Sequence, residues 1–206
     1  MKALICLLVF IKVVIAALPK GIDVSSHQPN INWPQVKANG IEFAYIKATE
    51  GTGYKSPQFN SQYTGATKVG LIRANGGGWT GDGITLPGAL DMEYNPYDSN
   101  KCYGLSQAAM VQWIRDFSNT YKSRTGRPPV IYTSTSWWQL CTGNYNGFGS
   151  ENPLWVARYA SAPGQLPAGW SFYSFWQYSD NASPNPGDAD VWNGSSASLK
   201  KFARGG

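Results

Sequence analysis

The chain has 206 residues, of which 42% are hydrophobic and 14% charged, and its formal net charge is +5. This length suits one domain with its own core, and the low charge with 14% aromatic residues excludes a disordered chain. The single histidine, His27, excludes a multi-histidine metal site, and a Ser–His–Asp or Cys–His mechanism would have to use it. We interpret His27, which precedes Gln28-Pro29, as a hydrogen-bonded loop residue and not a catalyst.

Residues 1–17 are predicted to be a secretory signal peptide, because Lys2 precedes two apolar stretches, residues 3–10 and 13–17, that end in small residues. The alternative is a buried N-terminal strand. The segment is too short and too interrupted to span a membrane, so we expect a secreted protein without membrane association. Residues 18–206 are predicted to form a single domain and a monomer.

Removal of the signal would take away two lysines, leaving 15 basic and 12 acidic residues and a net charge of +3. A mildly basic secreted protein is attracted to anionic polymers such as cell-wall glycans. We expect no nucleic-acid partner, because the sequence contains no run or stripe of Lys and Arg.

Short strands alternate with helices along the rest of the chain. Helices are predicted at residues 33–39, 56–69, 106–125, 136–140 and 196–203, and the longest begins at a Ser106 N-cap and ends at Gly126. Strands are predicted at residues 21–25, 43–49, 71–73, 87–94, 130–133, 154–158, 172–178 and 189–192. This alternation predicts an α/β fold with a parallel sheet, either open or closed into a barrel.

Two carboxylates lie two residues apart in the strand at 87–94. Asp91 and Glu93 would point to the same face of the strand, roughly 6.6–7 Å apart along the chain. Crowding of two acids raises the pKa of one of them, so that one carboxyl can be protonated while the other is charged. Glycoside cleavage needs this pair, a proton donor and a carboxylate. The pattern alone also fits two acids at a solvated strand end.

Other residues are candidates for the same glycoside-cleaving site. Asp23 lies in an apolar first strand, where a buried carboxylate is costly unless it is functional or paired, although it could instead cap a turn. Lys47 and Glu50 follow the second strand and could form an ordinary ion pair. Aromatic rings pack on the flat faces of sugars, so some of the tryptophans could bind glycans, with core packing as the alternative: Trp137, Trp138, Trp155 and Trp176.

Only two cysteines remain after removal of the signal, Cys102 and Cys141. An even number in a secreted chain predicts a disulfide between them, with two buried free thiols as the alternative.

Several ordered motifs resemble the glycoside hydrolase family 25 lysozymes, the N,O-diacetylmuramidases of Chalaropsis type. They are GIDVSSHQ at 21–28, FAYIKATEG at 43–51, GALDMEY at 88–94, PVIYT at 129–133, PLWVA at 153–157, FWQY at 175–178 and GDAD at 187–190. The resemblance implies a TIM-like β/α barrel with eight strands and fewer helices. It implies hydrolysis of the β-1,4 bond between N-acetylmuramic acid and N-acetylglucosamine in bacterial peptidoglycan, with no metal or cofactor.

The resemblance also implies roles for individual residues. Glu93 would be the general acid and then the base, and Asp91 would assist the substrate's acetamido group, with direct attack by Asp91 as the alternative. Asp23 and Asp190 match the other two active-site acids. The substrate-binding residues would be Glu50, Lys47, Tyr132, Trp176 and Gln177.

One segment departs from the family pattern. After Arg73 the family continues through a strand end and a crossover helix, whereas this sequence passes directly to Ala74 and a glycine run. Parallel neighbouring strands need a crossover of a dozen or more residues, usually a helix. We therefore expect a barrel that is incomplete around the third strand, with apolar surface exposed near the second and third strands and with reduced stability and activity. A catalytically impaired binder of peptidoglycan or chitin is the alternative function.

Overall fold

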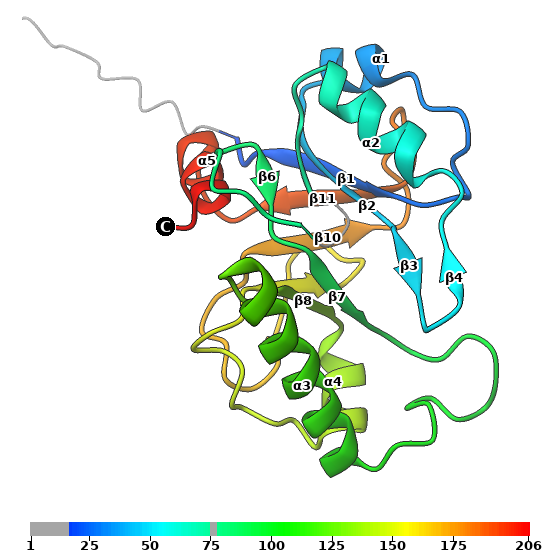
Figure 1. The fold of residues 1–206 in the computed structure, drawn as a ribbon, viewed down its shortest axis with the longest axis vertical. Helices are drawn as coiled ribbons and strands as arrows, with labels where there is room; N and C mark the ends of the chain where they lie inside the picture. Colours follow the sequence, from blue (N-terminus) through cyan, green and yellow to red (C-terminus); the bar gives the residue numbers. More distant parts are fainter. Residues whose placement is uncertain (1–16, 75–77) are drawn as a thin grey trace, which may run out of the picture.

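The structure is a computed structural model that describes residues 17–74 and 78–206, so the predicted signal peptide lies outside the described residues except for Ala17. A curled nine-stranded sheet forms an incomplete TIM-like barrel, in the order β6-β5-β2-β1-β11-β10-β9-β8-β7 (Figure 1). Its strands are β1 (Lys20–Val24), β2 (Ile41–Ile46), β5 (Ile72–Ala74), β6 (Thr85–Leu86), β7 (Ala89–Met92), β8 (Val130–Thr133), β9 (Leu154–Ala157), β10 (Phe175–Ser179) and β11 (Asp188–Trp192). The sequence predicted eight of these positions and the α/β class.

The sheet is parallel, as the sequence predicted, except at β11. This strand lies between β1 and β10 and runs antiparallel to both, while every other strand pair of the sheet is parallel. The reason is the connection from β10 to β11, which is a short turn without a helix and can therefore join only antiparallel strands. The start of β11 consequently lies at the same end of the barrel as the carboxyl ends of the parallel strands.

The strand predicted at residues 87–94 is part of a longer, bent segment. Its first part, β6, pairs with β5, and its second part, β7, pairs with β8 on the other side. Only Pro87 and Gly88 separate the two parts, and Pro87 has no N–H for a ladder. Within the described residues no strand pairs with β7 on the side that faces β5. The barrel wall is therefore open beside β7, at the position where the sequence lacks the crossover helix.

In the part of the chain that the structure describes, five helices surround the sheet: α1 (Trp33–Ala38), α2 (Phe59–Lys68), α3 (Gln107–Thr125), α4 (Thr135–Thr142) and α5 (Ser196–Arg204). In Figure 1, α1 and α2 cover the side of β1 and β2, while α3 and α4 cover β7 and β8. Apolar side chains fill both interfaces. A third cluster fills the barrel and includes Leu199 and Phe202 of α5, which covers the base of the barrel.

A small hairpin was not predicted from the sequence. It consists of β3 (Thr49–Glu50) and β4 (Tyr54–Lys55), which follow β2 directly. Each strand has only two residues, too few for an alternating pattern to be visible. The hairpin extends the barrel wall beyond the end of β2.

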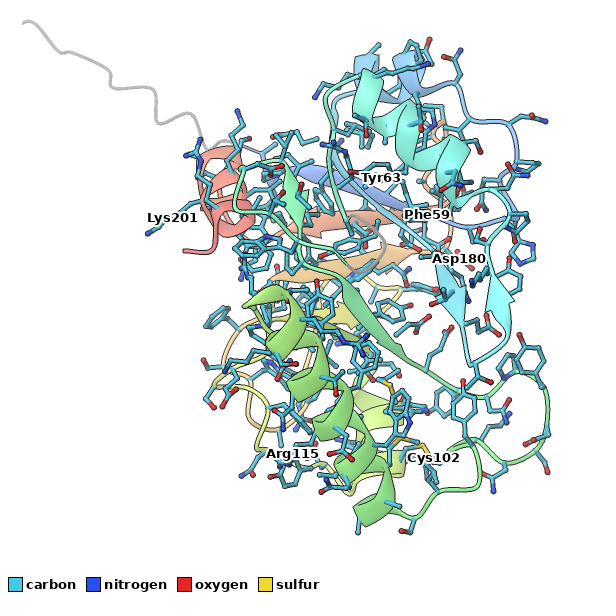
Figure 2. All side chains as sticks on the ribbon, in the orientation of Figure 1. Phe59, Tyr63, Cys102, Arg115, Asp180 and Lys201 are labelled. Atoms are coloured by element: carbon cyan, nitrogen blue, oxygen red, sulfur yellow. A yellow bond between two sulfur atoms is a disulfide. The ribbon has the colours of Figure 1, made fainter. Side chains whose placement is uncertain are left out.

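Cys102 and Cys141 form the predicted disulfide, with their Cα atoms 5.4 Å apart. Figure 2 shows Cys102 on the loop between β7 and α3, and Cys141 lies in α4. Replacing both cysteines by serine should lower the free energy of unfolding by roughly 4 kcal/mol, because the bridge closes a loop of about 40 residues in the unfolded chain. Denaturant unfolding of the oxidised protein and the variant measures this difference. Equal unfolding midpoints would contradict the expected contribution.

The exposed apolar surface is only partly where the sequence predicted it, since Ile84, whose carbonyl accepts a hydrogen bond from the Arg73 N–H of β5, is 44% exposed. The third strand, β5, is buried. The Arg73 guanidinium lies between β5 and α2, where it donates to Thr67 Oγ1 (2.8 Å) and lies over the Tyr63 ring. Apolar side chains are also exposed on α3, where Trp113 and Phe117 are 47% and 37% exposed. These two rings are stacked on each other, with their centroids 5.9 Å apart.

Candidate active site

A cleft of about 610 Å³ opens at the end of the barrel where the parallel strands finish. Five acids line it and come from different elements: Asp23 from β1, Glu50 from β3, Asp91 from β7, Glu93 just after β7, and Asp188 from the start of β11. The carboxyl ends of barrel strands are where the catalytic residues of such folds gather. The topology thus brings together side chains that lie far apart in the sequence.

Asp91 and Glu93 form the centre of this group. Along β7, Leu90 and Met92 are buried against α3 and α4, whereas Asp91 and Glu93 are accessible from the cleft. The walls of the cleft desolvate both carboxyls, and the charge of Glu93 adds to the effect on Asp91, whose pKa rises to about 8. The pKa of Glu93 is also raised, mainly by the same burial. A carboxyl pair of this kind retains one proton near neutral pH.

Lys47 opposes these shifts. It lies at the end of β2, and its positive charge lowers the pKa of both Asp91 and Glu93. Its ammonium forms an ion pair with Glu50, which also accepts a hydrogen bond from Tyr97 Oη. Glu50 and Tyr97 therefore join the β3–β4 hairpin to the loop after β7 across the rim of the cleft.

Gln177 connects two acids on the opposite wall of the cleft. Its side chain is 1% exposed, and its Nε2 donates to Asp23 Oδ2 (2.8 Å) and Asp188 Oδ2 (3.1 Å). Its Oε1 accepts from Tyr132 Oη (2.8 Å), which fixes the orientation of the amide. Two carboxylates are thus held in place by one buried amide, as an active site that needs fixed charges requires.

Asp190 differs from the expectation, because it does not line the cleft. Its side chain is fully buried below Asp23, and Trp155 Nε1 donates to its Oδ1 (2.8 Å). Burial and the nearby Asp23 raise its pKa well above the usual value. Asp188, two residues earlier on the same face of β11, lines the cleft instead. The spacing that singled out Asp91 and Glu93 would also have found Asp188.

The expected aromatic contacts are only partly in the cleft. Tyr132 and Trp155 line it, whereas Trp137 and Trp138 are fully buried in the core beside α3. Trp176 also lies outside the cleft lining, because alternation along β10 places Gln177 inward and Trp176 outward, against Tyr173 and Tyr178. The sequence had no signal that separates a core tryptophan from one that faces a cleft.

The rim contains tyrosines that the sequence analysis did not single out: Tyr54, Tyr97 and Tyr159. His27 also lies at the rim, exposed, and its backbone N–H donates to Ser25 Oγ (3.3 Å). Among residues 17–74 and 78–206, no group of His, Cys, Asp and Glu side chains is placed to hold a metal ion. No helix of this part of the chain combines the length and apolar character needed to cross a membrane.

The buried acids predict how stability depends on pH. The pKa of Asp23 is about 7 in the folded protein, mainly because of burial and the charge of Asp188, against an ordinary value of 3.8. Between these two pH values the folded chain binds more protons than the unfolded chain, so stability falls as pH rises, by up to ~1.4 kcal/mol per pH unit for this group. We expect the melting temperature to fall between pH 5 and pH 8, and Asp23→Asn to flatten the decline. A melting temperature that rises over this range would contradict the assignment.

A barrel cleft that contains several carboxyls and aromatic rings is typical of glycoside hydrolases. Comparisons with known proteins agree. The chain matches the family described as Glycosyl hydrolases family 25 over residues 22–75 and 72–186. It is 47% identical over 207 positions to the N,O-diacetylmuramidase of Arthroderma benhamiae, covering 91% of this chain and 87% of that protein.

Solved structures give the same result. The muramidase from Acremonium alcalophilum is 51% identical, with a TM-score of 0.88 over 91% of this chain and 100% of that one. The family GH25 lysozyme from Aspergillus fumigatus is 45% identical, with a TM-score of 0.88 over 92% and 100%. The chain therefore belongs to glycosyl hydrolase family 25 and is a glycoside hydrolase.

The family match also locates the missing segment. It consists of two pieces that meet at residues 72–75, at the Arg73–Ala74 junction. The Arthroderma alignment has 207 positions, whereas 91% of this chain is only about 187 residues, so some 20 positions of the relative face no residue here. A crossover helix with its loops has about this length.

Proposed function

We propose that this protein is a secreted muramidase that hydrolyses the β-1,4 bond between N-acetylmuramic acid and N-acetylglucosamine in bacterial peptidoglycan. The observation that carries the proposal is the position of Asp91 and Glu93 beside Asp23 and Asp188 in one cleft. All four residues lie outside the missing segment. The incomplete wall therefore affects how firmly the substrate is held, and the acids needed for cleavage are retained.

Glu93 acts as the general acid. Its carboxyl donates a proton to the glycosidic oxygen as the bond from that oxygen to the anomeric carbon breaks. The raised pKa of Glu93 supports this role, because it keeps a proton available to higher pH than an ordinary glutamate. After the leaving sugar departs, the Glu93 carboxylate accepts a proton from the attacking water.

Asp91 acts on the substrate's 2-acetamido group. The Asp91–Glu93 pair shares one proton, and in the reactive form this proton lies on Glu93 and leaves Asp91 charged. The acetamido carbonyl oxygen attacks the anomeric carbon, and the Asp91 carboxylate orients the amide and stabilises the positive charge that develops on it. Water then opens this cyclic intermediate from the opposite face, so the configuration at the anomeric carbon is retained overall. Direct attack by Asp91 on the anomeric carbon is the alternative and would give the same stereochemistry.

The remaining cleft residues hold the substrate. Gln177 fixes Asp23 and Asp188, whose carboxylates accept hydrogen bonds from sugar hydroxyls, while Tyr132 and Trp155 supply aromatic surface. Lys47 and Glu50 lie on the facing rim. Clearing of a suspension of bacterial cell walls by the purified protein tests the proposed function, and a suspension that stays turbid would argue for the alternative, a binder without activity.

A further inference from the structure

The open wall of the barrel changes the shape of the cleft. Because β7 has no partner strand on the side of β5, the cleft continues around this edge of β7 and reaches α3. Phe117 and Tyr121 of α3 line the same cleft as Asp91. An unpaired strand edge also presents backbone N–H and C=O groups, which can bond hydroxyl and acetamido groups.

The helix face at this opening has an ordered arrangement of rings. Trp113, Phe117 and Tyr121 are spaced four residues apart on α3, and neighbouring rings are nearly parallel, at interplanar angles of 24° and 11°. Tyr121 Oη accepts a hydrogen bond from the Gly88 N–H (2.6 Å), so the row is attached to the base of β7. Phe117 continues the row along the cleft wall, and Trp113, which does not line the cleft, extends it outward.

We propose that Trp113 and Phe117 form a secondary glycan-binding site, which holds a β-1,4-linked chain of N-acetylated sugars that leaves the cleft through the open wall. This inference rests on the proposed function, because it assigns a further length of the same substrate to this surface. The rings supply flat apolar faces for the sugar rings, and the edge of β7 supplies polar groups for their substituents.

A second copy of the chain fits this surface less well. An aromatic side chain has about 150–250 Å² of surface that can be buried. Because Trp113 and Phe117 are 47% and 37% exposed, their combined accessible area is on the order of 200 Å². A stable dimer needs about 800 Å² on each partner. The side chains in the next row of α3 are polar, with Gln112 Nε2 donating to Asp116 Oδ1 (2.8 Å). The patch is thus too small for a stable dimer interface, and its size suits sugar rings.

Binding of two oligosaccharides tests the inference. The protein carries Glu93→Gln to prevent cleavage, and calorimetry gives the Kd for the disaccharide and the hexasaccharide of β-1,4-linked N-acetylglucosamine. Trp113→Ala and Phe117→Ala should each raise the Kd for the hexasaccharide about 2- to 10-fold and leave that for the disaccharide unchanged. Trp113→Phe should restore most of the affinity. Phe172→Ala is the matched control, since Phe172 is 65% exposed and does not line the cleft.

Three results would overturn the inference. The first is an unchanged Kd for the hexasaccharide in both alanine variants. The second is an equal loss for both sugars, which would mean that the helix acts only through the fold. The third is a dimer in sedimentation that Trp113→Ala dissociates. Lysis of cell walls by the protein with Glu93 intact is measured in parallel, so that failure of the proposed function is recognised separately from failure of this site.

Discussion

Replacing Glu93 by glutamine is expected to lower the rate of cell-wall lysis by about 10²- to 10⁴-fold, the range in which a general acid–base contributes. Glutamine has nearly the same shape as glutamate but no proton to give to the leaving oxygen. Since Glu93 is accessible from the cleft and close to other acids, the melting temperature should stay the same or rise slightly. The initial rate of turbidity loss, at matched protein concentration, measures the effect.

Glu151→Gln is the control for this variant. Glu151 is exposed, pairs with Lys122 on the surface of α3, and does not line the cleft. The same chemical change at that position should leave lysis unaffected. If Glu93→Gln lysed cell walls as fast as Glu151→Gln, Glu93 would not be the proton donor.

Restoring a family-like strand end and crossover helix between Arg73 and Ala74 is expected to stabilise the protein. The inserted helix would cover Trp113 and Phe117, and burial of on the order of 200 Å² is worth up to ~5 kcal/mol before the cost of ordering the new segment. A net gain of half this amount would raise the melting temperature by about 5–10 °C. Lysis should also become faster, because the completed wall holds the substrate more firmly. Thermal unfolding followed by circular dichroism gives the melting temperature.

An insertion of the same length made of glycine and serine is the control for the added chain length. It supplies no apolar face, so it should leave the melting temperature unchanged or lower it. A present chain that melts as high and as cooperatively as the restored one would show that the missing segment is a tolerated variation and that the exposed rings cost little.

Much of the barrel was predictable because its strands carry local signals. The apolar runs at β2 and β8 and the Ser106 cap of α3 appear in the sequence and in the structure at nearly the same residues. Asp91 and Glu93 were predictable because their spacing fixes which face they share, independently of the rest of the fold. The disulfide followed from the number of cysteines.

The predictions that were wrong concern features that depend on which strands and helices come into contact. The direction of β11 is set by the short turn before it, and the buried position of Asp190 by the packing of Trp155 above the barrel core. Side chains alternate along β10, so Trp176 points outward, although we expected this aromatic residue to contact the sugar. Arg73 covers the side of β5 that faces α2, a contact between side chains that no local pattern predicts, while Trp113 and Phe117 of α3 are exposed.

The reducing ends released from purified peptidoglycan test the central claim most directly. The products are separated and identified by mass spectrometry after reduction with borohydride, with the Glu93→Gln protein as the blank. A muramidase leaves N-acetylmuramic acid at every new reducing end, and we expect this sugar from the unaltered chain and almost none from the variant. New ends made of N-acetylglucosamine, or equal release by both proteins, would contradict the proposed function.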